Sequence, residues 1–98
     1  MIYIGGANCE PCKIWKGTQK RDWVKSKEYP LVRYVEIEPM ELQEAYVARN
    51  WREWRWVLDG IQQRAGTPRF IVLKNRDIIS NSTSWTSTYG TIKLALGG

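Results

Sequence analysis

The only two cysteines of the chain, Cys9 and Cys12, are two residues apart and follow a short apolar segment. That segment, residues 2–5, has the composition of a short buried strand. Pro11 suits the first turn of a helix, where a missing N–H has no cost. The pattern therefore predicts a strand-to-helix junction that carries both thiols. Because a helix start stabilises a thiolate, this arrangement is typical of a redox dithiol.

Length and composition restrict the alternatives. The 98 residues suffice for one domain, residues 1–98, without a second core. The chain has no histidine, which excludes Ser/His and Cys/His catalysis and most metal sites. Its net charge of +5 suits acidic or nucleic-acid partners, but also any basic soluble protein. No run of about 18 apolar residues is present, so we expect no membrane span.

Hydrophobic patterning predicts alternating helices and strands. Strands are expected at residues 2–5, 31–37, 70–73 and 78–81, and helices at 10–27, 41–59 and 88–96. The order β-α-β-α-β-β-α indicates an α/β fold with a mixed four-stranded sheet and helices on both faces. Strand 31–37 is apolar on both sides, which is typical of a strand covered on both faces.

Two helices are predicted from their apolar faces. The inner face of helix 10–27 is expected to hold Ile14, Trp15, Trp23 and Val24, and Gly17-Thr18 is a weak point that favours a kink. In helix 41–59, a single stripe repeats at helical spacing and consists of Val47, Trp51, Trp54 and Leu58.

A second motif, Thr67-Pro68, stands just ahead of the predicted strand 70–73. Together with Asn-Cys-Glu-Pro-Cys-Lys at residues 8–13, it makes the chain resemble the thioredoxin-like fold family over residues 1–96. The Trp-rich helix before Pro68 is most similar to that of small exported bacterial members. The resemblance implies a cis-proline at Pro68 that faces the dithiol across a substrate groove. The backbone of Thr67 is then free to pair with an extended peptide.

The resemblance also implies thiol–disulfide oxidoreductase activity on protein thiols and disulfides. Cys9, partly exposed at the helix N-terminus, is expected to attack a substrate disulfide, and Cys12 to resolve the mixed disulfide. No cofactor is implied beyond this dithiol, although a redox partner must recycle it. We expect a monomer. The leaning is towards an exported, periplasmic protein in its mature form, and a cytoplasmic location is the alternative.

The residues around the cysteines are expected to tune them. Glu10 disfavours a Cys9 thiolate, and Lys13 acts in the opposite direction beside Cys12. Pro11, between the cysteines, belongs to the same tuning set. The expected pKa of Cys9 is moderately depressed, which favours a reductase or an isomerase. Many thioredoxins have a buried acid where this chain has Tyr3, so that proton acceptor is missing or replaced; the candidates are Glu36, Glu38, Glu41 and Glu44.

Other interpretations remain open at this point. The first is a redox-inactive or slow protein-interaction module on the same scaffold. Residues 49–56 alternate arginine with tryptophan, which fits nucleic-acid stacking but fits better an amphipathic helix with Trp51 and Trp54 inside. A third possibility is a client-binding surface with Trp56 exposed. Lys16 and Lys20 are assigned to a solvated helix face, and Arg69 to holding an acidic group near the groove.

Overall fold

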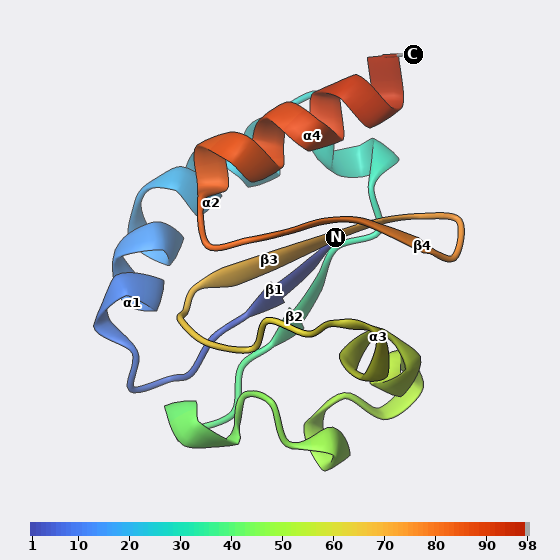
Figure 1. Cartoon of the computed structure of the whole chain (residues 1–98). Coiled ribbons are helices and arrows are strands. Elements are labelled where there is room, and N and C mark those ends of the chain that lie inside the picture. Colours follow the sequence, from blue (N-terminus) through green and yellow to red (C-terminus); the bar gives the residue numbers. More distant parts are fainter. Residues whose placement is uncertain (98) are drawn as a thin grey trace.

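The computed structural model of the chain describes residues 1–97 (Figure 1). Its helices and strands are β1 (Ile2–Ile4), α1 (Glu10–Gly17), α2 (Gln19–Lys25), β2 (Val35–Ile37), α3 (Arg55–Gly60), β3 (Arg69–Lys74), β4 (Asp77–Ser82) and α4 (Trp85–Gly97). Four short 3-10 turns lie between these elements. None of the helices within residues 1–97 has both the length and the apolar character of a membrane-spanning segment.

The four strands form one sheet in the order β2-β1-β3-β4. β1 runs parallel to β2 and antiparallel to β3, and β3 and β4 form an antiparallel hairpin. The hairpin turn includes Asn75 at a positive φ of 59°, a conformation that asparagine tolerates. Helices α1, α2 and α4 lie on one face of the sheet and α3 on the other (Figure 1). The predicted α/β class, with a mixed four-stranded sheet covered on both faces, is confirmed.

Alternating strand residues feed two separate cores. Tyr3, Phe70 and Val72 point towards α1, α2 and α4, where they meet the buried indoles of Trp15 and Trp23. The intervening strand residues point to the α3 side and include Ile2, Ile4, Ile37 and Ile71. This period of two is what a sheet buried on both faces requires. The first core is mainly aromatic, and Trp15 packs 4.9 Å from Phe70 between ring centroids.

The predicted helix 10–27 is divided at Thr18 into α1 and α2. The break falls at the weak point expected from Gly17-Thr18. Trp15 and Trp23 are buried, but Ile14 and Val24 are exposed, so half of the predicted inner face was wrong. Consecutive helical residues point about 100° apart, and only one of each neighbouring pair can face the sheet.

The predicted helix 41–59 was largely wrong. The structure has three 3-10 turns there, and only α3 is α-helical. Side chains take the carbonyls that a continuous helix would use: the Asn50 amide donates to the Glu44 carbonyl, and the Trp51 indole N–H to that of Ala45. Arg52 then adopts a positive φ of 45°. Of the predicted apolar stripe, Trp51 and Leu58 are buried and Trp54 packs against the same core, whereas Val47 is only half-buried.

Two further boundaries differ from the prediction. β2 is only three residues long and pairs with β1 alone, and Leu31, predicted to lie in this strand, is in a 3-10 turn with its side chain exposed. As an edge strand, β2 does not need the two-sided burial that its composition indicated. α4 begins three residues before the predicted start, because the Ser84 hydroxyl accepts the N–H of Ser87 as an N-cap.

The burial contrast along α4 gives a direct test of the core. Ile92 is 2% exposed beneath this helix, whereas Leu94 is 79% exposed. We expect Ile92→Ala to lower the free energy of unfolding by about 2–5 kcal/mol, and Leu94→Ala to change it by less than about 0.5 kcal/mol. Urea denaturation measures both values. Similar losses for the two variants would contradict the described packing of α4.

Candidate functional site

Cys9 and Cys12 form a disulfide at the start of α1, with their Cα atoms 5.2 Å apart. Cys9 is the N-cap of this helix, in an extended backbone conformation, and its Sγ accepts the backbone N–H of Cys12 at 3.2 Å. The sulfur therefore occupies the place of the oxygen of a serine or aspartate cap. An N–H donor at this point stabilises negative charge on Cys9 when the disulfide is reduced.

The exposure predicted for Cys9 was wrong. Cys9 is only 2% exposed, and Cys12 is fully buried. One cause is the approach of Thr67, whose Oγ1 lies 3.3 Å from Sγ of Cys9. The two motifs, separated by more than fifty residues in the sequence, thus meet in side-chain contact.

Sheet register explains how Thr67 reaches the disulfide. In the antiparallel pairing of β1 with β3, Ile4 is opposite Arg69, so the residues before β3 lie beside the end of β1. The Thr67–Pro68 peptide bond is cis, as the resemblance predicts. Arg69 is 5% exposed, and its guanidinium donates to the side chain of Asn81 and to the Ala65 carbonyl.

Arg69 therefore has a different role from the one predicted. Its hydrogen-bond partners are neutral oxygens of its own chain, and it fixes the segment leading to Thr67 rather than an external acidic group. The sequence held one signal for this role, since Arg69 directly precedes the apolar run of residues 70–73.

The predicted tuning residues between and after the cysteines point away from the sulfurs. Glu10 and Lys13 are exposed and form an ion pair with each other at 3.2 Å. Pro11 is exposed in the first turn of α1, where its missing N–H is tolerated. Exposed pairs of this kind contribute little, about 0–1 kcal/mol, and each charge here offsets the other. Glu10 and Lys13 are thus poorly placed to tune the cysteines.

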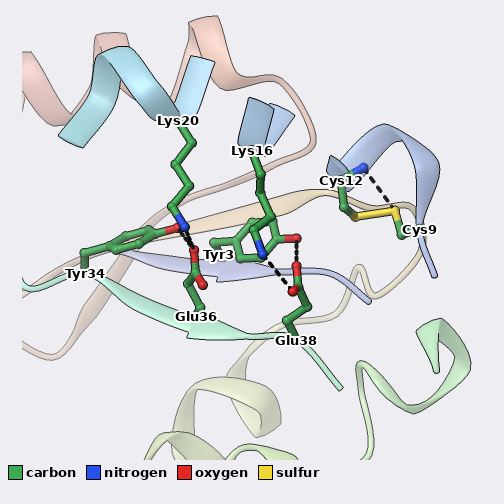
Figure 2. A network of polar contacts seen from close by, with 8 residues as sticks. All are labelled: Tyr3, Cys9, Cys12, Lys16, Lys20, Tyr34, Glu36 and Glu38. Atoms are coloured by element: carbon green, nitrogen blue, oxygen red, sulfur yellow. Dashed lines mark hydrogen bonds and ion pairs between the residues drawn. A yellow bond between two sulfur atoms is a disulfide. The ribbon is translucent and has the colours of Figure 1, made fainter. Parts of the chain in front are cut away.

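The fourth predicted tuning residue, Tyr3, is buried and belongs to a polar network (Figure 2). Its hydroxyl donates to Oε2 of Glu38 at 2.6 Å, and the ammonium of Lys16 donates to Oε1 of the same carboxylate at 2.8 Å. Burial, reinforced by the bond to Glu38, raises the pKa of Tyr3 well above its usual range. The bond to Glu38 likewise raises the pKa of Lys16. Tyr3 is therefore a neutral phenol at physiological pH.

Gly5 brings this network next to the disulfide. A Cβ atom built on Gly5 would lie 2.3 Å from the Tyr3 hydroxyl oxygen and 2.9 Å from Sγ of Cys12. Both atoms thus border the same small space, and a glycine is needed there. Figure 2 shows the Tyr3 hydroxyl turned towards the end of the sheet that carries the disulfide.

A second network of the same composition is centred on Glu36, two positions before Glu38 in the chain. Tyr34 donates to Glu36 at 2.6 Å, and Lys20 donates to the same carboxylate at 2.5 Å (Figure 2). Lys16 and Lys20 were predicted to be solvated, but each is bound to one of these glutamates. The spacing that could have revealed both networks is i and i+2 for the two glutamates and i and i+4 for the two lysines.

Residues 49–56 were predicted as part of an amphipathic helix with Trp51 and Trp54 inside, and the structure confirms the burial of Trp51 alone. Trp51 is buried. Trp54 and Trp56 are half-buried, and each carries a guanidinium over its ring, from Arg33 at 4.8 Å and Arg76 at 4.7 Å. These cation–π contacts occupy one face of each ring. Trp51 thus belongs to the core, and the other two rings are packed against arginines of their own chain.

Comparison with known proteins identifies no relative. No protein-family model, curated protein or solved structure matches the chain. Within residues 1–97, no group of three or more His, Cys, Asp or Glu side chains is arranged to hold a metal ion.

The crowding at Gly5 can be tested against a glycine with free space. We expect Gly5→Ala to lower the free energy of unfolding by about 1–3 kcal/mol, because the added methyl group displaces the Tyr3 ring or the Cys12 sulfur. Gly90→Ala meets nothing within 4 Å in the middle of α4 and should raise stability by about 0.5–1 kcal/mol. Opposite signs in thermal or urea denaturation support this geometry, and a neutral Gly5→Ala contradicts it.

Proposed function

We propose that the protein is a thiol–disulfide oxidoreductase with a thioredoxin-like fold. The observation that carries the proposal is the contact between the two motifs, with Sγ of Cys9 3.3 Å from Thr67. The disulfide lies at a helix N-terminus, beside the segment that precedes an antiparallel strand. One of its sulfurs thus has both a helix N–H donor and a threonine hydroxyl next to it. The strand order β2-β1-β3-β4, with one parallel and two antiparallel pairings, supports the fold assignment.

In the proposed reaction, the Cys9 thiolate attacks a disulfide of a protein substrate. A bond forms between Cys9 and one substrate sulfur, and the other substrate sulfur leaves as a thiolate. Cys12 then attacks Cys9, which forms the Cys9–Cys12 disulfide and releases the second substrate thiolate. Two electrons pass from the dithiol to the substrate. The donation from the Cys12 N–H supports Cys9 as the attacking residue, since it favours the thiolate there.

A second candidate function is a slow or redox-inactive protein-interaction module on the same scaffold. The burial of Cys9, at 2% exposure, favours it, because a thiol must reach the sulfur in line with the disulfide. For catalysis, the covering segment that contains Thr67 has to move aside in the oxidised state. The two functions differ in the rate at which the disulfide exchanges.

The reduction of insulin by dithiothreitol separates the two. We expect the wild-type protein to accelerate precipitation of the reduced insulin chains, and Cys9→Ser to return the rate to that of dithiothreitol alone, since no nucleophile remains at the helix cap. Glu10→Gln is the matched control on the same helix and should stay within about twofold of wild type, because its charge is exposed and paired. Equal rates for wild type and Cys9→Ser would refute the enzymatic function.

A further inference from the structure

Cys12, the resolving thiol, needs a group that accepts its proton, and Cys9 cannot supply one. Cys12 is fully buried, and burial in apolar surroundings keeps a thiol protonated. To attack the mixed disulfide, Cys12 must lose its proton. A group that accepts this proton has to be within reach and has to lead to solvent.

Tyr3 and Glu38 have the geometry for this transfer. The Tyr3 hydroxyl borders the same space at Gly5 as Sγ of Cys12, and it donates to Oε2 of Glu38 at 2.6 Å. Tyr3 itself is buried, whereas the side chain of Glu38 is 20% exposed. The chain of atoms thus runs from a buried sulfur, through a buried phenol, to a carboxylate at the surface.

We propose that Tyr3 relays the proton of Cys12 to Glu38 during resolution of the mixed disulfide. This inference rests on the proposed oxidoreductase function. As the sulfur of Cys12 attacks Cys9, its proton passes to the Tyr3 oxygen, and the Tyr3 proton passes to Oε2 of Glu38. The Cys9–Cys12 bond forms, the bond from Cys9 to the substrate breaks, and the substrate leaves as a thiolate. Glu38 is left neutral and returns its proton to water.

The electrostatics of the network fit this direction. A phenol with a raised pKa does not hold a negative charge, but it can accept one proton while it donates another. The phenol of Tyr3 therefore passes the proton on, and the carboxylate of Glu38 is the group that finally accepts it. Lys16 binds Oε1 and leaves Oε2 to Tyr3, so Lys16 is a positioning residue.

The second network serves as an internal control. Tyr34, Glu36 and Lys20 repeat the same three side chains at nearly the same distances. Tyr34 packs beside Trp23 and Tyr29, whereas the aromatic neighbours of Tyr3 are Trp15 and Phe70. Removal of the Tyr34 hydroxyl or the Glu36 charge reproduces the loss of a phenol–carboxylate bond and leaves the Tyr3–Glu38 hydrogen bond in place.

The test uses 5,5′-dithiobis(2-nitrobenzoate), which reports both steps on the reduced full-length protein. Its first nitrothiophenolate is released when Cys9 attacks, and its second when Cys12 resolves the adduct. We expect the second phase in Tyr3→Phe and in Glu38→Gln to slow at least about tenfold near neutral pH, as is usual for loss of a general base. The first phase should stay within about twofold, and so should both phases in Tyr34→Phe and Glu36→Gln.

The pH profile separates proton transfer from a structural effect. In wild type, the second-phase rate should be nearly flat from about pH 6 to 9. In Tyr3→Phe and Glu38→Gln it should rise with pH, because hydroxide and solvent then have to remove the Cys12 proton, and the deficit should shrink at high pH. Slowing that is the same at every pH, or equal slowing in the Tyr34→Phe control, would overturn the relay.

A measurement on the wild-type protein covers the case of variants that do not fold. The second phase should slow at least about twofold in heavy water, because protons move in that step, while the first phase should not. No isotope effect on the second phase would overturn the relay. Failure of the proposed function looks different: the wild-type protein would then release no second nitrothiophenolate at all.

Discussion

The pairing of β1 with a strand on each side determines where every candidate functional residue lies. Because β2 runs parallel to β1, the C-terminal ends of both strands lie at the same end of the sheet. Glu38 therefore lies near the point where β1 leads into the Cys9 loop. Because β3 runs antiparallel to β1, the start of β3 and the preceding Thr67 lie at that same end of the sheet. Three segments distant in the sequence thus converge on one disulfide. Without these backbone pairings, the cysteines at the start of α1 would have neither Thr67 nor Glu38 nearby.

The converging segments place different physical environments around the two sulfurs. Cys9 has a backbone N–H donor and the hydroxyl of Thr67 beside it, which suits a group that becomes negatively charged. Cys12 lies in the aromatic core and borders the Tyr3 hydroxyl across the space at Gly5. This asymmetry is the physical basis for assigning attack to one cysteine and resolution to the other.

The sequence predicted the features that depend on local pattern. The strand-to-helix junction at Cys9, the break near Thr18 and the α/β class follow from periodicity and turn residues, and all are confirmed. Residues 41–54 were not predictable in this way, because side-chain bonds such as that from Trp51 to the Ala45 carbonyl displace the helical ones. Local periodicity does not report contacts across the sheet. It therefore predicts neither the burial of Cys9 nor which of the four glutamates binds Tyr3.

Cys9 and Cys12 have unequal roles in the proposed reaction, and single-cysteine variants separate these roles. The reduced Cys12→Ser and Cys9→Ser variants would each be incubated with native insulin, whose disulfides are intact. Their intact masses would then be measured under non-reducing conditions. We expect Cys12→Ser, which retains the helix-cap sulfur, to accumulate a disulfide-linked insulin chain at least about tenfold faster than Cys9→Ser. Equal rates of adduct formation, or faster reaction through Cys12, would contradict these roles.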